Sequence, residues 1–73
     1  MYRVYCFELA KENQCKAEEI LHKYHVNNVI DVKHMEQSQR SGVTIVRYWL
    51  TCVCSDEIEF IANELKANGV VLF

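Results

Sequence analysis

Apolar and polar residues follow the same order in two stretches of this chain. Residues 17–32 read AEEILHKYHVNNVIDV and residues 58–73 read IEFIANELKANGVVLF. Each stretch has apolar residues at the i, i+3, i+4, i+7 spacing of an amphipathic helix, followed by an asparagine-containing turn and a short apolar run. Ile20 and Ile61 occupy equivalent places when the copies are set 41 positions apart. The pattern predicts a helix–turn–strand unit that occurs twice.

Each unit is preceded by another run of aromatic and β-branched residues, which is typical of a β-strand. The second helix opens on the segment SDE at 55–57, and Asp56 with Glu59 is expected to form a capping box. The polar segment QSQRSG at 37–42 is expected to be a flexible loop. The expected elements are strand 2–9, helix 13–24, strand 29–36, strand 43–54, a helix over 55–68 and strand 70–73.

The element order βαββαβ determines the expected fold. The chain contains no proline, and right-handed crossover connections place both helices on the same side of the sheet. This order is typical of the ferredoxin-like α+β fold, in which four antiparallel strands lie in the spatial order 4-1-3-2. We therefore expect a single domain over residues 1–73, with a four-stranded antiparallel sheet and two helices on one face.

The other face of such a sheet is uncovered, and strand parity assigns residues to it. The third strand is hydrophobic on both sides, whereas a strand with water on one side alternates apolar and polar residues. We expect the smaller Val4 and Cys6 to lie under the helices, which leaves Tyr5 and Phe7 on the uncovered face. An apolar face rich in aromatic residues indicates a binding surface. The predicted partner-binding residues are Tyr5, Phe7, Val43, Ile45, Arg47, Trp49 and Thr51.

Length and charge narrow the classes of partner. The chain has 73 residues and a formal net charge of −2, so electrostatic attraction does not favour a phosphate backbone or an anionic membrane. The longest apolar run, at 43–54, is too short to span a bilayer and contains Arg47. The N-terminus shows no secretory leader, so we expect a cytoplasmic protein whose cysteines stay reduced.

The cysteines allow two interpretations. Cys52 and Cys54 are expected on one face of the third strand, and Cys6 on that same face. Three thiolates there would bind zinc or Cu(I), with His34 as a distant fourth ligand. The alternative is that these thiols are small buried hydrophobic groups. Because a strand lacks the turn that wraps ligands around a metal, we favour the buried interpretation and expect no metal and no cofactor.

No residue pattern indicates an enzyme. Cys15 and His22 are seven positions apart on the first helix, among charged residues, and are expected on its solvated side. The acids of the second helix suit the positive end of the helix dipole and form no acid–base pair. We therefore expect no catalytic residues.

Two segments resemble the RNA-recognition motif family, which shares the βαββαβ order. The run VYCFEL at 4–9 is similar to the first-strand signature of that family, with Tyr5 in the position that stacks on a base. The run SGVTIVRY at 41–48 is similar to the third-strand octamer, with matches at Gly42, Val46 and Tyr48. The resemblance implies binding to single-stranded nucleic acid.

The chain departs from that family at the stacking positions. Val43 and Ile45 stand where the family has aromatic rings, and Ser41 replaces its leading basic residue. A second resemblance is to small ligand-sensing modules of the same topology, the ACT domains, whose first loop bears glycine. That loop, AKEN at 10–13, has no glycine here. Nucleic-acid binding and ligand sensing are therefore kept as alternatives.

The sequence favours a small non-enzymatic regulatory or interaction module. A domain of this length buries only about 60% of its unfolded surface, and association with a second chain is a common source of added stability. The expected partner is a protein, either a second copy in a homodimer or another target in a small regulatory complex, for example as an inhibitor. The uncovered sheet face is the expected contact surface.

Overall fold

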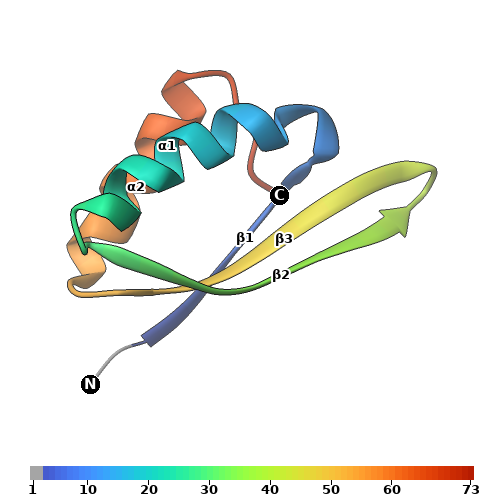
Figure 1. Cartoon of the computed structure of the whole chain (residues 1–73). Coiled ribbons are helices and arrows are strands. Elements are labelled where there is room, and N and C mark those ends of the chain that lie inside the picture. Colours follow the sequence, from blue (N-terminus) through green and yellow to red (C-terminus); the bar gives the residue numbers. More distant parts are fainter. Residues whose placement is uncertain (1–2) are drawn as a thin grey trace.

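A three-stranded antiparallel sheet and two helices make up this small α+β fold, and both helices lie on the same face of the sheet (Figure 1). The computed structural model describes residues 3–73. Tyr2, which we expected at the start of the first strand, lies outside the described residues. The elements in order are β1 (Arg3–Ala10), a 3-10 turn (Lys11–Asn13), α1 (Gln14–Val26), β2 (Ile30–Arg40), β3 (Val43–Cys52) and α2 (Ser55–Ala67).

Strand β3 is the middle strand, with β1 on one side and β2 on the other, and both neighbours run antiparallel to it. In the β1–β3 register, Phe7 lies opposite Tyr48. The β2–β3 register shifts between Val32 and His34, so that Lys33 has no partner residue in β3. Such a bulge locally increases the twist of a strand.

The expected fourth strand at 70–73 does not form, and the prediction of a four-stranded ferredoxin-like sheet is therefore wrong. Within the described residues, this segment makes one isolated bridge, between Leu72 and Leu9. The amide of Phe73 also donates a hydrogen bond to the carbonyl oxygen of Glu8 at 2.9 Å. Among residues 3–73 the sheet consequently has three strands, and one end of β1 is paired on its outer side.

The turn after α2 explains the loss of this strand. Gly69 has a φ of 83°, in the left-handed region, and the amide of Val70 donates to the carbonyl oxygen of Leu65 at 2.9 Å. The Val70 side chain is buried in the core. Val70 thus closes the end of the helix instead of pairing with β1, and contact with the sheet begins only two residues later.

The core lies between the helices and the sheet. From β3, alternate residues of the strand point into it, and β1 contributes the residues opposite them. The apolar stripes of the two helices cover these side chains, as the helical spacing in the sequence predicts. The fully buried large side chains are Leu9, Val46, Leu50, Ile61, Leu65 and Val70.

Helix α2 begins at Ser55 as expected, but without the side-chain cap that the sequence predicts. The capping box of Asp56 and Glu59 does not form, because Cys54 occupies the N-cap position of α2 and makes no side-chain capping bond. At the other end of α1, Asn28 takes a positive φ of 60°, which asparagine tolerates better than most residues. The asparagine-containing turn therefore ends α1 as predicted.

The β2–β3 hairpin is longer than expected. The segment predicted to be a flexible loop continues β2 to Arg40, and the connection is a two-residue turn at Ser41 and Gly42. Both residues have positive φ, 54° and 80°, which is typical of the tight turns that match the twist of a hairpin. The hairpin extends beyond the helices as a two-stranded arm (Figure 1).

Candidate functional site

No helix of residues 3–73 covers one face of the sheet (Figure 1), and alternation along β3 identifies the residues of that face. Val46, Tyr48, Leu50 and Cys52 belong to the core beneath the helices, so the intervening β3 residues point to the opposite side. We call that side the open face. Its β3 residues are Val43, Ile45, Arg47, Trp49 and Thr51. Their partners across the register are Val4, Cys6, Glu8 and Ala10 of β1 and Asp31, His34, Glu36, Ser38 and Arg40 of β2.

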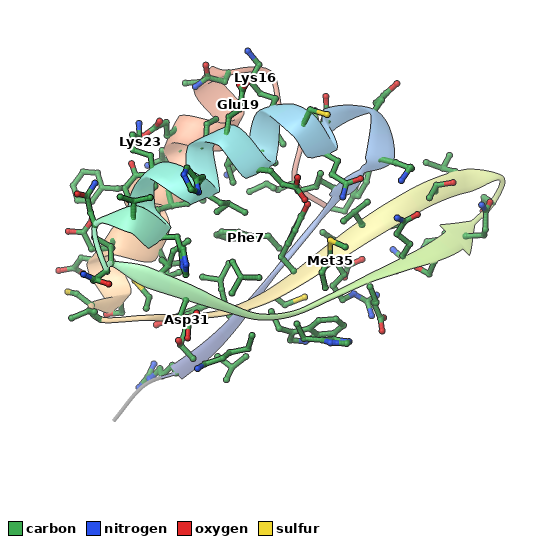
Figure 2. All side chains as sticks on the ribbon, in the orientation of Figure 1. Phe7, Lys16, Glu19, Lys23, Asp31 and Met35 are labelled. Carbon is green, nitrogen blue, oxygen red and sulfur yellow. The ribbon has the colours of Figure 1, made fainter. Side chains whose placement is uncertain are left out.

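Tyr5 and Phe7 do not lie on the open face, which corrects our assignment of the first strand. Phe7 belongs to the core, with 8% of its surface exposed, and Tyr5 packs against the core. Figure 2 shows the Phe7 side chain in the space between the sheet and the helices. The larger aromatic side chains fill that space. The smaller Val4 and Cys6 lie on the open face instead, and Val4 is 62% exposed.

Trp49 lies in the centre of the open face between two partners. The ring of His34 on β2 lies beside it, with 5.1 Å between the ring centroids and a tilt of 38°. The guanidinium carbon of Arg47 lies 5.4 Å from the centroid of the Trp49 ring, a cation–π distance. Trp49 remains partly exposed. The indole is thus held by neighbours on its own sheet and still presents surface to solvent.

Next to this ring, ion pairs cross all three strands. The carboxylate of Glu8 on β1 lies 3.3 Å from Arg47 on β3 and 3.1 Å from Arg40 on β2. Arg47 also pairs with Glu36 on β2 at 3.1 Å. The Nε atom of Arg47 is buried and has no hydrogen-bond partner among the described residues. Both arginines on this face are therefore neutralised by glutamates.

The open face is mixed in character, not uniformly apolar as we expected. Ile45 lies on it but is only 4% exposed, so it contributes little accessible surface. Val43 is 47% exposed and Thr51 is partly exposed, near opposite ends of the β3 row. Besides Arg47 of β3, the charged residues come from β1, whose two sides we had assigned the wrong way round, and from β2, whose sides we had not assigned from the sequence. The alternation of Asp31 with Val32 indicates which side of β2 is polar. This pattern in the sequence could have identified the charged residues of the open face.

The cysteines of the metal site that we considered as the less favoured alternative do not come together. Cys52 is buried on the helix side of the sheet, whereas Cys6 is exposed on the open face. Cys54 follows β3, and its carbonyl oxygen accepts a hydrogen bond from the Cys52 thiol at 3.0 Å. Among residues 3–73, no group of three or more His, Cys, Asp or Glu side chains is placed to hold a metal ion. The expectation that Cys6 shares a face with Cys52 was wrong.

Burial raises the pKa of the Cys6 thiol, although the neighbouring Arg47 acts in the opposite direction. A thiol with a raised pKa is less nucleophilic at neutral pH. On α1, Cys15 and His22 are both exposed, as expected for its solvated side. These positions give no arrangement of a nucleophile beside a base.

The two segments that resemble the RNA-recognition motif family are not presented together. Val43 and Ile45 of the octamer lie on the open face, but Tyr5 of the first-strand signature points toward the helices. A base-stacking platform requires rings from both strands on one face. Trp49 and His34 supply rings at other positions.

A shallow groove also runs between α1 and β2, which the sequence did not indicate. It is lined by Leu21 of α1, by Val32 and Met35 of β2 and by Tyr48 of β3. Figure 2 shows Met35 on the side of β2 that faces the helices. Met35 is 41% exposed, and the side-chain amide of Gln14 at the start of α1 lies 3.7 Å from its sulfur atom. Glu18, His22 and His25 of α1 complete its lining, so the groove combines apolar and polar side chains.

No protein-family model matches this chain, and neither a curated protein nor a solved structure is significantly similar to it. Within residues 3–73, no helix combines the length and the apolar composition needed to cross a bilayer.

Proposed function

We propose that this protein is a non-enzymatic interaction module that binds a protein partner through the open face. The observation that carries the proposal is the position of Trp49. Its ring is partly exposed in the centre of a sheet face without a helix, and it is oriented by His34 and Arg47. Tryptophan and arginine are strongly enriched among the residues that dominate binding energy.

The surroundings of Trp49 support a protein contact. Interfaces typically combine an aromatic centre with a polar rim. Here the exposed apolar side chains of Val4 and Val43 lie on the same face as Trp49, with the Glu8–Arg47–Glu36 ion pairs between the strands. Because Arg47 is held on both sides by carboxylates, little side-chain entropy remains to be lost when a partner covers it.

Charge argues against single-stranded nucleic acid as the ligand. A phosphate backbone is bound by basic side chains that release its counterions. On the open face, Arg40 and Arg47 already form ion pairs with glutamates, and the chain as a whole has a net charge of −2. The aromatic pair Trp49–His34 alone does not provide the electrostatic part of such binding.

The partner is either a second copy of this chain or another protein, in the manner of a small regulatory subunit or inhibitor. A standard interface buries roughly 800 Å² on each partner. We place this action in the cytoplasm, where the four cysteines, which form no disulfide in the structure, would stay reduced.

A site-specific cross-link tests the proposal in the cells that make the protein. A photoreactive benzophenone side chain at position 51 lies on the open face beside Trp49, and the same group at Asn63 lies on the exposed side of α2. We expect a defined protein adduct from position 51 and none from position 63. An adduct with nucleic acid, or no adduct from position 51, would contradict the proposal.

The partner identified in this way then allows a binding measurement. Trp49→Ala should weaken binding by about 2 kcal/mol, or roughly thirty-fold in the dissociation constant, because the indole is the anchor. Phe60→Ala is the matched control: it removes an aromatic ring that is 65% exposed on α2, in the other layer of the fold. Equal effects of the two substitutions would show that Trp49 is not the anchor.

A further inference from the structure

Within the part of the chain that the structure describes, the outer edge of β1 is free along most of its length. Leu72 and Phe73 pair with this edge only at Leu9 and Glu8, and from Arg3 to Phe7 no strand among the described residues lies beside it. An edge strand with unpaired N–H and C=O groups is a template for pairing with another chain.

The directions of the free backbone groups follow from one hydrogen bond. The carbonyl oxygen of Glu8 accepts the bond from Phe73, so the backbone groups of Glu8 point away from β3. In an antiparallel strand the N–H and C=O of alternate residues point to the same side. Val4 and Cys6 therefore direct their N–H and C=O groups outward, whereas those of Tyr5 and Phe7 point toward β3.

The two edges of the sheet differ. The β2 edge carries the bulge at Lys33 and charged residues on both sides of it, Asp31 and Glu36 among them. Bulges and charges are the means by which native proteins prevent edge strands from associating. The segment of β1 from Val4 to Phe7 has no charge, no proline and no bulge. Of these two edges, the β1 edge is the one suited to pairing with another strand.

We propose that β1 pairs with β1 of a second copy, antiparallel and about a two-fold axis at Tyr5, to form a six-stranded sheet. Pairing of a strand with its own copy closes as a dimer, since each copy presents the same segment. The axis at Tyr5 places Val4 of one copy opposite Cys6 of the other, and these are the two residues with outward N–H and C=O groups.

The neighbouring register with its axis at Cys6 fits less well. An axis at Cys6 would place Val4 opposite Glu8, whose carbonyl oxygen is already bonded to Phe73. The axis at Tyr5 needs no group that the chain already uses. It also covers the exposed side chains of Val4 and Cys6, which meet across the axis, and places no like charges opposite each other. The C-terminal segment thus sets the register by occupying one end of the edge.

This association uses an edge of the sheet, and the proposed function uses its open face, so the two are separable. The native mass of the purified chain, measured by sedimentation from micromolar to millimolar concentration, should rise from monomer to dimer. Trp49→Ala should leave this equilibrium unchanged. A monomer at every concentration would overturn the dimer, as would a dimer that Trp49→Ala dissociates.

The substitution Cys6→Pro tests the hydrogen bonds of the β1 edge separately from the rest of the sheet. It removes an outward N–H without removing a ladder bond to β3, and proline is tolerated at such edge positions. Two lost hydrogen bonds per dimer should raise the dissociation constant by about tenfold or more. The matched control is Lys33→Pro at the β2 bulge, where the residue has no partner in β3, and it should leave the dimer intact. A dimer that survives Cys6→Pro in a protein with unchanged circular dichroism would overturn the proposal.

A cross-link tests the register without depending on that variant. Directly opposite residues of a non-hydrogen-bonded pair have Cα atoms about 4.5 Å apart, within the range of a disulfide. In a background with serine at Cys6, Cys15 and Cys54, Tyr5→Cys should therefore form an intermolecular disulfide under mild oxidation. Val4→Cys in the same background should not, because it faces position 6 of the other copy. Equal cross-linking of the two variants would exclude an axis at Tyr5.

Discussion

At the scale of single residues, one carboxylate joins the two helices. Glu64 of α2 forms an ion pair with Lys23 of α1 and accepts a hydrogen bond from the hydroxyl of Tyr24 at 2.5 Å. The hydrogen bond from Lys23 lowers the pKa of Glu64, and the hydrogen bond to Glu64 raises the pKa of Tyr24 to about 12. The contact lies near the C-terminal ends of the two helices, and Lys23 and Glu64 occupy equivalent positions of the repeated units, 41 residues apart.

This contact should make stability depend on pH. A glutamate whose pKa is lowered in the folded state stabilises the fold above the ordinary pKa of about 4.3, and the contribution is lost as the pH falls further. Glu64→Gln should therefore cost up to about 1 kcal/mol at pH 7, since the pair is partly exposed, and little at pH 3. Urea unfolding of both proteins at the two pH values measures the difference. A cost that is the same at both pH values would contradict this account.

At the same scale, the least predictable feature was which side chains of β1 face the helices and which lie on the open face. Tyr5 and Phe7 alternate with Val4 and Cys6, so both sides of the strand are apolar and the sequence pattern alone does not assign them. Packing decided the matter, because the space under the helices requires the larger side chains. For β3 the assignment of Trp49 to the uncovered side agrees with the register, since the neighbouring Tyr48 and Leu50 fill the core.

At the scale of elements, the helices followed from their periodicity, whereas the arm did not. The apolar spacing around Ile20 and Ile61 identifies both helices, and these residues are buried. The segment 37–40 is exposed on both sides in β2, so it shows no alternation that would indicate a strand. Similarly, the last strand was predicted from apolar residues of which Val70 packs against the helices instead. A local pattern of apolar residues predicts that they are buried, but it does not predict which other element buries them.

The hairpin turn gives a prediction for a single element. A Cβ at Gly42 would meet no atom within 4 Å, so a substitution there acts only through the positive φ of 80°. Gly42→Ala should destabilise the protein by about 1 kcal/mol. Ser41→Asn, at the other positive-φ position, should be neutral or slightly stabilising, because Asn-Gly is preferred in such turns. Thermal unfolding distinguishes them, and a neutral Gly42→Ala would mean that the turn relaxes.

At the scale of the whole molecule, the fold depends on one middle strand. β3 pairs with both other strands along nearly its entire length, and its inward residues contact the cluster formed by both helices. A domain of this size has a free energy of unfolding of roughly 4–10 kcal/mol, so one core side chain is a large fraction of it. We expect the chain to unfold as one cooperative unit.

Leu50 tests this dependence. Its side chain is fully buried in the middle of β3, and Leu50→Ala should lower the free energy of unfolding by about 3 kcal/mol through lost burial and a residual cavity. Val53→Ala, three residues later at a position 67% exposed, should cost less than about 0.5 kcal/mol. Chemical denaturation followed by tryptophan fluorescence and by circular dichroism should give coincident transitions. Separate transitions for the two signals would contradict a single unit.

Strand β3 carries Leu50 in the interior and Trp49 on the open face as consecutive residues. A partner that binds through Trp49 would bind only the folded chain. At a partner concentration one hundred times the dissociation constant, this binding would add about 2.7 kcal/mol to the free energy of unfolding. For so small a domain this is a large share of its total stability. We therefore expect cellular proteases to remove unaccompanied copies faster than bound ones, so that the supply of the partner sets how long each molecule persists.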